Sequence, residues 1–370
     1  NSPYFLDSIK ANIQSPILDS IYHATIEKSA LLKGDRFRTM DFEQERNRLF
    51  HLFRNAGVYT FQLNSIDFNV GIDSSGVDYQ LPVKLNIRNY IENQEGAAIE
   101  KEYKISKMKS VKVLIGKVGN TGSEPYDSIG TFEGLSLYSQ GKMRYNSRLL
   151  RESISFKPNE TYSDAARSKT LKQLTRLQSF DYPTIRYNYV DEDETLLDAS
   201  IYLMPKERYS LDFGLDVTQS NIIKRGIAFS SGLSALNVFR GAETLELGAR
   251  GSVGRSADIA ITEFAFDVQL RAPQFLFPFT KKINRQEIEP QTIFRIGSGV
   301  QNNIGLDKQN LTGTIQYQWS PRKNRRWTFS LAEVEFVNNK NKENYFGVYT
   351  NAYSELNTIA ANTNTNPSYL

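Results

Sequence analysis

The spacing of apolar residues divides the chain near Lys206 into two regions of different character. Before Lys206, stretches with helix-like spacing of apolar residues occur between stretches in which apolar and polar residues alternate, as they do in strands. After Lys206 the apolar period is two, and no helical pattern follows. The pattern predicts an α+β region followed by a long antiparallel β region.

One stretch, FEQERNRLFHLFRNAGVYTF at residues 42–61, forms the clearest local unit. Its apolar residues at i, i+3, i+4 and i+7 make the stripe of an amphipathic helix: Leu49, Leu52, Phe53 and Ala56. We expect Asp41 to cap this helix and Gln44 to complete a capping box. We expect Gly57 to end it in a left-handed conformation, and Tyr59 and Phe61 to lead into an aromatic strand.

The order strand, helix, helix, strand, strand occurs twice before Lys206. The first copy reads YFLDSIKANI, SPILDSIYHATI, the helix above, SIDFNVGI and LPVKLNIRNYI. The second reads EYKISKMKSVKVLIG, NSRLLRESI, SDAARSKTLKQLTRLQSF, TIRYNYV and TLLDASIYLMP. We expect tandem modules at 1–95 and 96–206, with an insertion at about 117–144 in the second. Two unrelated α+β domains are the alternative.

The region 207–370 contains about seven alternating stretches of roughly 9–11 residues, the length with which a tilted strand crosses a bilayer. In ITEFAFDVQLRAP one side of the strand carries four successive apolar residues: Phe264, Phe266, Val268 and Leu270. Strands of globular proteins are shorter, about 5–6 residues. Aromatic residues also collect at the strand ends: Phe239, Phe275, Phe277, Phe279, Trp319 and Trp327.

These features favour a membrane β-barrel in which the four apolar side chains face lipid while Asp267 and Arg271 face a wet lumen. A soluble β-rich binding protein, with the apolar face turned inward, is the alternative from a different class.

Composition narrows the chemistry further. The chain has no cysteine and only two histidines, which excludes thiolate chemistry and leaves little for histidine-based catalysis. The 45 Lys+Arg and 41 Asp+Glu give a net charge of +4, too balanced to indicate a nucleic-acid partner. We expect no enzymatic activity, no metal and no cofactor, and we interpret the acidic run DEDE, residues 191–194, as a solvated turn.

Several stretches, in order along the chain, resemble the BamA/TamA family of outer-membrane assembly proteins. GDRFRTMDFEQERNRLFHLFRNAGVYTF resembles a POTRA module, with the helix-end motif at Gly57, Tyr59 and Phe61. NSRLLRESISFKPNETYSDAARSKTLKQLTRLQSF resembles the barrel-proximal POTRA module. ERNRLFHLFRNAGVYTF is closest to the TamA-like lipoprotein branch of Bacteroidota.

Two further stretches resemble the family's barrel. SALNVFRGAETLELGARGS resembles the turn between the second and third barrel strands, which Asn237, Phe239 and Gly241 match. LRAPQFLFP resembles the exit of the fourth strand. The fold implied is α+β POTRA modules of order β-α-α-β-β, followed by an antiparallel transmembrane β-barrel of which about half is present. Because an open sheet edge in lipid leaves backbone groups unpaired, we expect the chain to be part of a longer protein.

The resemblance also implies a location and an activity. POTRA modules in the periplasm and a barrel in the bacterial outer membrane of a Gram-negative bacterium would insert or translocate other outer-membrane proteins. The implied partners are outer-membrane lipids, unfolded outer-membrane protein clients and a TamB-type or other periplasmic assembly protein. A two-partner secretion transporter, which exports one dedicated substrate, is the alternative.

A lateral gate follows from the same resemblance, because the first barrel strand of the family pairs weakly with the last. In this chain that strand is 211–218, with the gate residues Leu211, Phe213, Gly214, Leu215 and Val217. Gly214 has no side chain to pack, and we expect it to soften the pairing.

Overall fold

The computed structural model describes residues 3–71, 79–94, 97–116, 125–190, 194–219, 225–256, 259–276, 288–303, 306–322, 324–340 and 350–363. These residues fold into two compact units. One comprises Asn1–Met143, Arg151–Arg176 and Phe180–Met204, and the other comprises Arg144–Leu150, Leu177–Ser179 and Pro205–Leu370. No helix among the described residues is long and apolar enough to cross a membrane.

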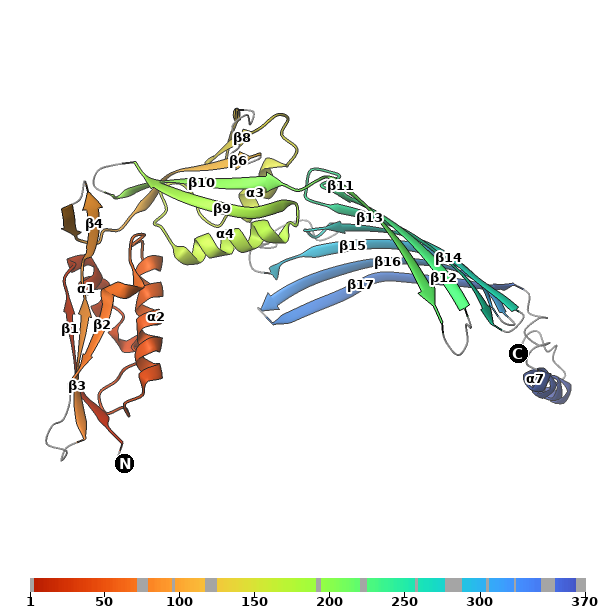
Figure 1. The fold of residues 1–370 in the computed structure, drawn as a ribbon, viewed down its shortest axis with the longest axis horizontal. Coiled ribbons are helices and arrows are strands. Elements are labelled where there is room, and N and C mark those ends of the chain that lie inside the picture. Colours follow the sequence, from red (N-terminus) through yellow and green to blue (C-terminus); the bar gives the residue numbers. More distant parts are fainter. Residues whose placement is uncertain are drawn as a thin grey trace. The chain divides into compact units, whose positions relative to one another are not determined.

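The first module has the expected order of elements. They are β1 (Phe5–Ile13), α1 (Pro16–His23), η1 (Ile26–Lys28), α2 (Thr39–Asn55), η2 (Leu63–Ser65), β2 (Ile66–Val70) and β3 (Gln80–Ile87) (Figure 1). The strands form a sheet of order β1-β3-β2, parallel between β1 and β3 and antiparallel between β3 and β2. Both helices cover the sheet through one buried core that includes Leu18, Leu49, Phe53, Ile66 and Leu85.

Helix α2 differs at its start from the sequence prediction and agrees at its end. Arg38 occupies the N-cap position and no side chain caps the helix. Asp41 therefore lies in the first turn, where it accepts a hydrogen bond from Arg38 Nε at 2.9 Å, and the predicted capping box was wrong. Gly57 follows the helix with φ of +112°, and Val58 N–H donates to Phe53 O at 3.0 Å, as in a Schellman motif.

A two-stranded hairpin follows the first module, formed by β4 (Tyr90–Gln94) and β5 (Ala97–Lys101). The module boundary predicted at 95/96 lies between these strands, outside the described residues. The second module contains β6 (Lys107–Ile115), β7 (Asp127–Phe132), β8 (Leu135–Ser139), α3 (Ser147–Ser153), α4 (Asp164–Arg176), β9 (Phe180–Tyr189) and β10 (Leu196–Pro205).

The insertion in the second module has a definite structure. It contributes the antiparallel hairpin β7–β8, and β8 runs parallel to β6, so the sheet has the order β7-β8-β6-β10-β9. The remaining strands repeat the first module, with β6, β10 and β9 in the places of β1, β3 and β2.

The two modules also share a bond pattern where the first strand meets the turn before the long helix. Phe37 N–H donates to Tyr4 O at 2.8 Å in the first module, and Tyr162 N–H donates to Ser106 O at 2.9 Å in the second. An antiparallel bridge stands beside each bond, Phe5 to Arg36 and Lys107 to Thr161. The shared pattern argues for copies of one unit and against two unrelated domains.

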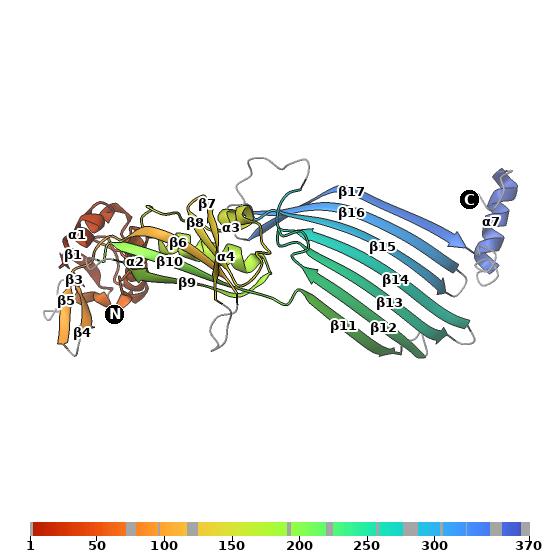
Figure 2. The same ribbon diagram turned by 90° about the horizontal axis from the view of Figure 1, so that it is seen from above.

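The region after Pro205 forms one antiparallel sheet whose seven strands pair in chain order (Figure 2). They are β11 (Tyr209–Thr218), β12 (Arg225–Leu236), β13 (Thr244–Ser256), β14 (Ile259–Ala272), β15 (Gln291–Asn303), β16 (Leu306–Arg322) and β17 (Arg325–Lys340). All seven predicted strands are present. β11 has 10 residues, within the predicted range, and the other six strands are longer than predicted, up to 17 residues in β16.

A helix, α7 (Thr350–Thr363), follows the sheet, although no helical pattern was expected after Lys206. Its sequence, TNAYSELNTIAANT, is largely polar, with Ile359 exposed and Ala360 buried. A helix with so weak an apolar stripe gives little signal in the spacing of apolar residues.

Candidate functional site: an apolar sheet face, strand edges and a module junction

The strand register puts apolar side chains on one face of the seven-stranded sheet. Directly opposite residues lie on the same face. One such row crosses four neighbouring strands, from β11 to β14, and consists of Leu211, Leu233, Leu247 and Val268. Phe264, Phe266, Val268 and Leu270 therefore share this face with residues of every other strand: Leu211, Phe213, Leu215, Val217, Ile227, Phe229, Val253, Ile296, Leu311, Val334 and Phe336.

This face has no covering layer among the described residues. Phe264 is 59% exposed, Phe213 is 67% exposed and Val217 is 82% exposed. Soluble monomers rarely expose contiguous apolar patches beyond a few hundred Å². The face extends over all seven strands, and burying it in an apolar surrounding would be favourable.

The opposite face is polar and hollowed. One register row across all seven strands reads Asp212, Gly232, Gly248, Asp267, Gly297, Thr312 and Glu335. Beside it, a pocket of about 340 Å³ is lined by Arg250, Glu263, Asp267 and Arg295. Asp267 and Arg271 both lie on this face, as the alternation predicted.

Aromatic side chains gather at the end of the sheet where β12, β14 and β16 finish. Phe275 packs edge-on against Tyr317 and Trp319 with centroids 5.6 and 6.0 Å apart, and Trp319 lies 6.0 Å from Trp327. Phe239, in the turn at the same end, is 69% exposed. Phe277 and Phe279 lie outside the described residues.

The turn at residues 237–243 joins the second and third strands of this sheet, β12 and β13. Asn237 adopts φ of +55° and its Oδ1 accepts a hydrogen bond from Ala242 N–H at 3.0 Å. Glu243 accepts from the backbone N–H groups of Phe239 and Gly241 at 3.2 and 2.9 Å. Asn237 and Gly241 thus lie in a turn that Glu243 closes. The role of Glu243 was not predicted from the sequence.

The gate residues lie on β11, the first edge strand of the sheet. Leu211, Phe213, Leu215 and Val217 point to the apolar face, while Gly214 points to the polar face opposite Ser230. A Cβ on Gly214 would stand 2.4 Å from Ser230 Oγ, so the glycine permits this close approach. Among the described residues, β11 pairs only with β12 and β17 pairs only with β16.

Three of the four module edges are covered or interrupted. The start of β1 is covered by the turn at 34–37, through Leu6 N–H to Asp35 O and Gly34 N–H to Leu6 O, both 2.8 Å. β7 has a register shift between Ser128 and Gly130. β9 contains Pro183, which has no N–H, next to Tyr182 with φ of +42°. Bulges and prolines are known protections of strand edges.

Among the described residues, no such feature covers or interrupts the edge formed by β2. At the ends of its ladder, Arg88 N–H donates to Ser65 O at 3.0 Å and Gly71 N–H donates to Pro82 O at 2.8 Å. Because hydrogen-bonded pairs alternate in antiparallel ladders, Asp67 and Asn69 are bonded to β3. The backbone groups of the alternate residues then point away from β3, to the edge that no described strand pairs with: Ile66, Phe68 and Val70.

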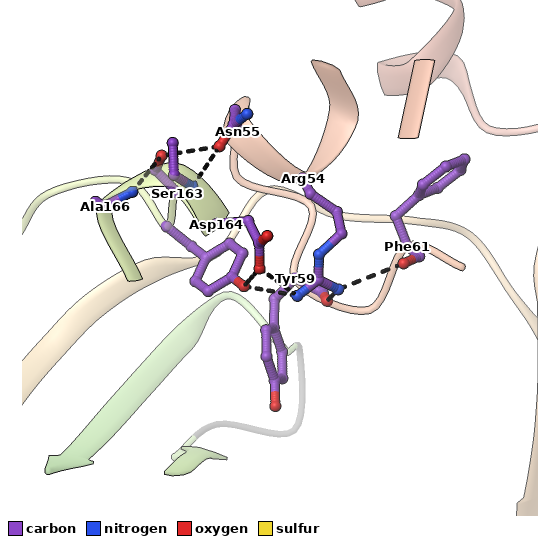
Figure 3. Close-up of polar contacts among 9 residues, drawn as sticks. Arg54, Asn55, Tyr59, Phe61, Ser163, Asp164 and Ala166 are labelled. Atoms are coloured by element: carbon purple, nitrogen blue, oxygen red, sulfur yellow. Dashed lines mark hydrogen bonds and ion pairs between the residues drawn. The ribbon is translucent and has the colours of Figure 1, made fainter. Parts of the chain in front are cut away.

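The two modules meet at Arg54, near the end of α2 (Figure 3). Its Nη1 donates to Tyr59 O at 2.5 Å and to Phe61 O at 3.4 Å within the first module. Its Nη2 donates to Tyr162 Oη at 2.6 Å and to Asp164 Oδ1 at 3.1 Å in the second. The guanidinium also lies 5.7 Å from the Tyr59 ring centroid and 5.4 Å from that of Tyr162.

Asn55, the next residue, caps a helix of the other module. Its Oδ1 accepts hydrogen bonds from Ala165 N–H at 2.7 Å and from Ser163 Oγ at 3.1 Å, at the start of α4 (Figure 3). Ser163 directly precedes α4, and its Oγ accepts a hydrogen bond from Ala166 N–H at 3.4 Å. The helix-end motif therefore joins the modules: Gly57 O accepts from Ser106 N–H at 3.0 Å.

Glu194 makes a second link between the modules and corrects the interpretation of DEDE. Its side chain is 18% exposed, bonds Lys101 Nζ at 2.7 Å and accepts a hydrogen bond from Tyr90 Oη. Glu194 is therefore a partly buried contact with the β4–β5 hairpin; residues 191–193 lie outside the described part of the chain. Burial opposes its ionisation, but the bonds from Lys101 and Tyr90 lower the pKa of its carboxyl overall.

We compared the sequence and the fold with those of known proteins. No protein-family model matches the sequence, and no curated protein matches it either. Among solved structures, the chain is similar to BamA from Haemophilus ducreyi lacking POTRA domains 1–3, with a TM-score of 0.52 and 11% identity over 92% of this chain. The fold is BamA-like. The chain covers 52% of that structure, so it spans about half its length.

Two further structures align less well. CdiB from Acinetobacter baumannii matches over 92% of this chain and 65% of its own length, at 9% identity and a TM-score of 0.32. The POTRA3–5 structure of Haemophilus influenzae BamA matches over 55% of this chain and 97% of its own length, at 11% identity and a TM-score of 0.21. The fold assignment depends on the first similarity alone.

The predicted fold class is thereby confirmed. POTRA-like α+β modules precede a seven-stranded, unclosed antiparallel sheet that matches part of a BamA barrel. Among the described residues, no group of three or more acidic or histidine side chains is placed to hold a metal ion.

The ionised state of Asp164 predicts how module stability depends on pH. Burial raises the pKa of this carboxyl, but hydrogen bonds from Tyr162 and Arg54 outweigh burial and lower it overall. A carboxyl whose pKa is lower in the folded state stabilises that state fully when the pH is above its unfolded pKa of about 4. This stabilisation is lost as the pH falls through the folded-state pKa. Urea unfolding followed by helix circular dichroism should show stability falling in acid, with a shallower fall in Asp164→Asn. Equal slopes in both proteins would contradict this assignment.

Proposed function

We propose that this chain belongs to an outer-membrane protein assembly factor. Its POTRA-like modules receive clients or a partner protein in the periplasm, and its sheet forms part of a barrel wall through which clients are inserted or translocated. The observation that carries the proposal is the uncovered apolar face of a sheet whose other face is charged. A soluble β-rich binding protein would need a layer over that face.

The dimensions of the apolar face suit a bilayer. On β16 the apolar face runs from Leu311 to Trp319, about 26 Å along the strand at about 3.3 Å per residue. Beyond it the register row Thr262, Asn302, Asp307 and Lys340 is polar. Barrels of the outer membrane carry an apolar band about 25 Å tall with aromatic girdles, and Trp319 and Trp327 suit one such girdle.

The client surface that we propose is the open edge of β2. An extended segment can add to an exposed edge through main-chain hydrogen bonds, which recognise unfolded chains regardless of their exact sequence. Ile66, Phe68 and Val70 would supply the donors and acceptors. Both edge strands of the second module, β7 and β9, carry features that hinder the addition of a strand, so we propose β2 as the client-binding edge.

The gate that we propose is β11, with Leu211, Phe213, Gly214, Leu215 and Val217. Its outer edge is unpaired in the described part of the chain, so a client strand could pair with it. Gly214 weakens β11 because a strand glycine packs no side chain against its neighbours.

The finer assignments come from sequence resemblance. The stretch 45–61 is closest to the TamA-like branch of Bacteroidota, and a TamB-type partner follows from that branch. We propose this partner for the modules, outer-membrane lipids for the apolar face, and an outer-membrane location with the modules in the periplasm.

The membrane assignment predicts that charge on the apolar face blocks insertion. Phe266→Arg should cost about 2–4 kcal/mol at the bilayer midplane, because a charged side chain would lose its hydration in lipid. The measurement is the fraction of protein that floats with lipid vesicles and resists protease. The matched control is Ala265→Arg, which places the same charge on the polar face beside the hollow. Equal insertion of both variants would show that lipid does not cover this face.

The β2 assignment predicts where an unfolded client binds. A photocrosslinking amino acid at the exposed Asn69 should capture an unfolded outer-membrane protein, while the same probe at the exposed Thr184, beside Pro183 on β9, should capture little. Crosslinking in bacterial cells, read by mass spectrometry, makes the comparison. Capture of one dedicated secreted substrate instead of varied clients would favour a two-partner secretion transporter.

The gate assignment predicts a difference between two leucines of one register row. Leu211 lies on the edge strand and Leu247 lies on the interior strand β13, on the same apolar face. A photocrosslinker at position 211 should capture a stalled client, and one at 247 should not. No crosslink above background at 211 counts against the gate.

A further inference from the structure

We infer that Arg54 and Asn55 form a latch that holds the two modules at one fixed angle, and that the latch can open without unfolding either module. Arg54 and Asn55 both belong to the first module, and each bonds the start of α4 in the second. The proposed client surface and gate play no part in this inference.

Arg54 is suited to the role because its guanidinium forms hydrogen bonds with both modules. Its side chain is 17% exposed and that of Asp164 is 21% exposed, so water competes weakly for either. Within one fork, Nη1 is held by carbonyl oxygens of the first module and Nη2 by Tyr162 and Asp164. A planar guanidinium bonded in two directions fixes orientation better than a flexible ammonium does.

Asn55 adds a second, differently directed constraint. It satisfies the Ala165 N–H, one of the amides at the start of α4 that have no partner within the helix. Because the acceptor comes from another module, this one amide of α4 is capped only while the modules stay docked.

The repeated bond pattern indicates that the turn of the second module can form without the latch. The turn that presents Tyr162 to Arg54 is built by the Tyr162–Ser106 bond and the Lys107–Thr161 bridge. The first module forms the same pattern with Phe37, and no counterpart of Arg54 contacts it among the described residues. The docking surface is therefore formed by the module itself, and the latch only occupies it.

Other contacts between the modules limit the effect of opening the latch. Glu194 accepts a hydrogen bond from Tyr90 Oη, and Ser106 N–H donates to Gly57 O. A Cβ on Gly57 would stand 2.6 Å from Thr161 and 2.7 Å from Ile105 side-chain atoms, which shows how closely the chains approach there. Loss of the latch should therefore widen the range of angles while the modules remain joined.

The test measures the distance between the modules in the full chain. The chain has no cysteine, so spin labels can be placed at Asn47→Cys on α2 and Ser168→Cys on α4, both exposed. The parent should give a single narrow distance distribution by pulsed electron paramagnetic resonance. The double variant R54A/N55A should lose that narrow peak and give a broad one.

Two controls make the result specific. Arg46→Ala removes another guanidinium of α2, whose partner Glu43 lies in the same helix, and it should leave the narrow peak intact. Labels at Lys10→Cys and Asn47→Cys, both within the first module, should keep their distance in R54A/N55A. The inference is overturned if the intermodule peak stays narrow in R54A/N55A, if Arg46→Ala broadens it equally, or if the distance within the first module changes.

Discussion

Backbone hydrogen bonding between neighbouring strands is the constraint on which both units of this protein depend. A strand that pairs on one side leaves donors and acceptors on the other, and those groups must meet water, a covering segment or another strand. The α+β modules cover or interrupt most of their edges, by the turn at 34–37, the bulge at Gly130 and Pro183. Within the described ranges, β2 and β11 each have one edge with no partner strand, and we propose that the molecule acts there.

The seven-stranded sheet adds a second constraint, which comes from its side chains. From residue 263 to residue 271 of β14, alternation puts Phe264, Phe266, Val268 and Leu270 on one face and the charges of Glu263, Asp267 and Arg271 on the other. Neither face suits the environment of the other: the apolar face gains from leaving water, whereas Arg250, Glu263, Asp267 and Arg295 would lose hydration in an apolar surrounding. Under the proposed function a bilayer outside and water inside meet both requirements at once.

The periodic elements could be predicted from sequence, and the contacts between them could not. The helix stripe at Leu49 and Phe53, the module repeat and the seven strands followed from spacing, because spacing reports which face of an element is buried. The cap predicted at Asp41 was wrong because α2 begins two residues earlier, at Thr39. Helix α7 was missed because its apolar stripe is weak, and Glu194 was misread because its partners lie about a hundred residues away in the chain.

The sequence by itself determined which side chains lie on which face of each element, since that depends only on helical or strand period. It also determined the left-handed end of α2, because Gly57 tolerates a positive φ that other residues resist. Only the tertiary structure decided which strand edges stay open and which polar groups meet across the module junction. Arg54, Asn55 and Asp164 carry no local signal of their partnership, because the distance along the chain between them says nothing about their distance in space. FRNAGVYTF therefore reads locally as the end of one helix, and the fold makes it the contact that joins two modules.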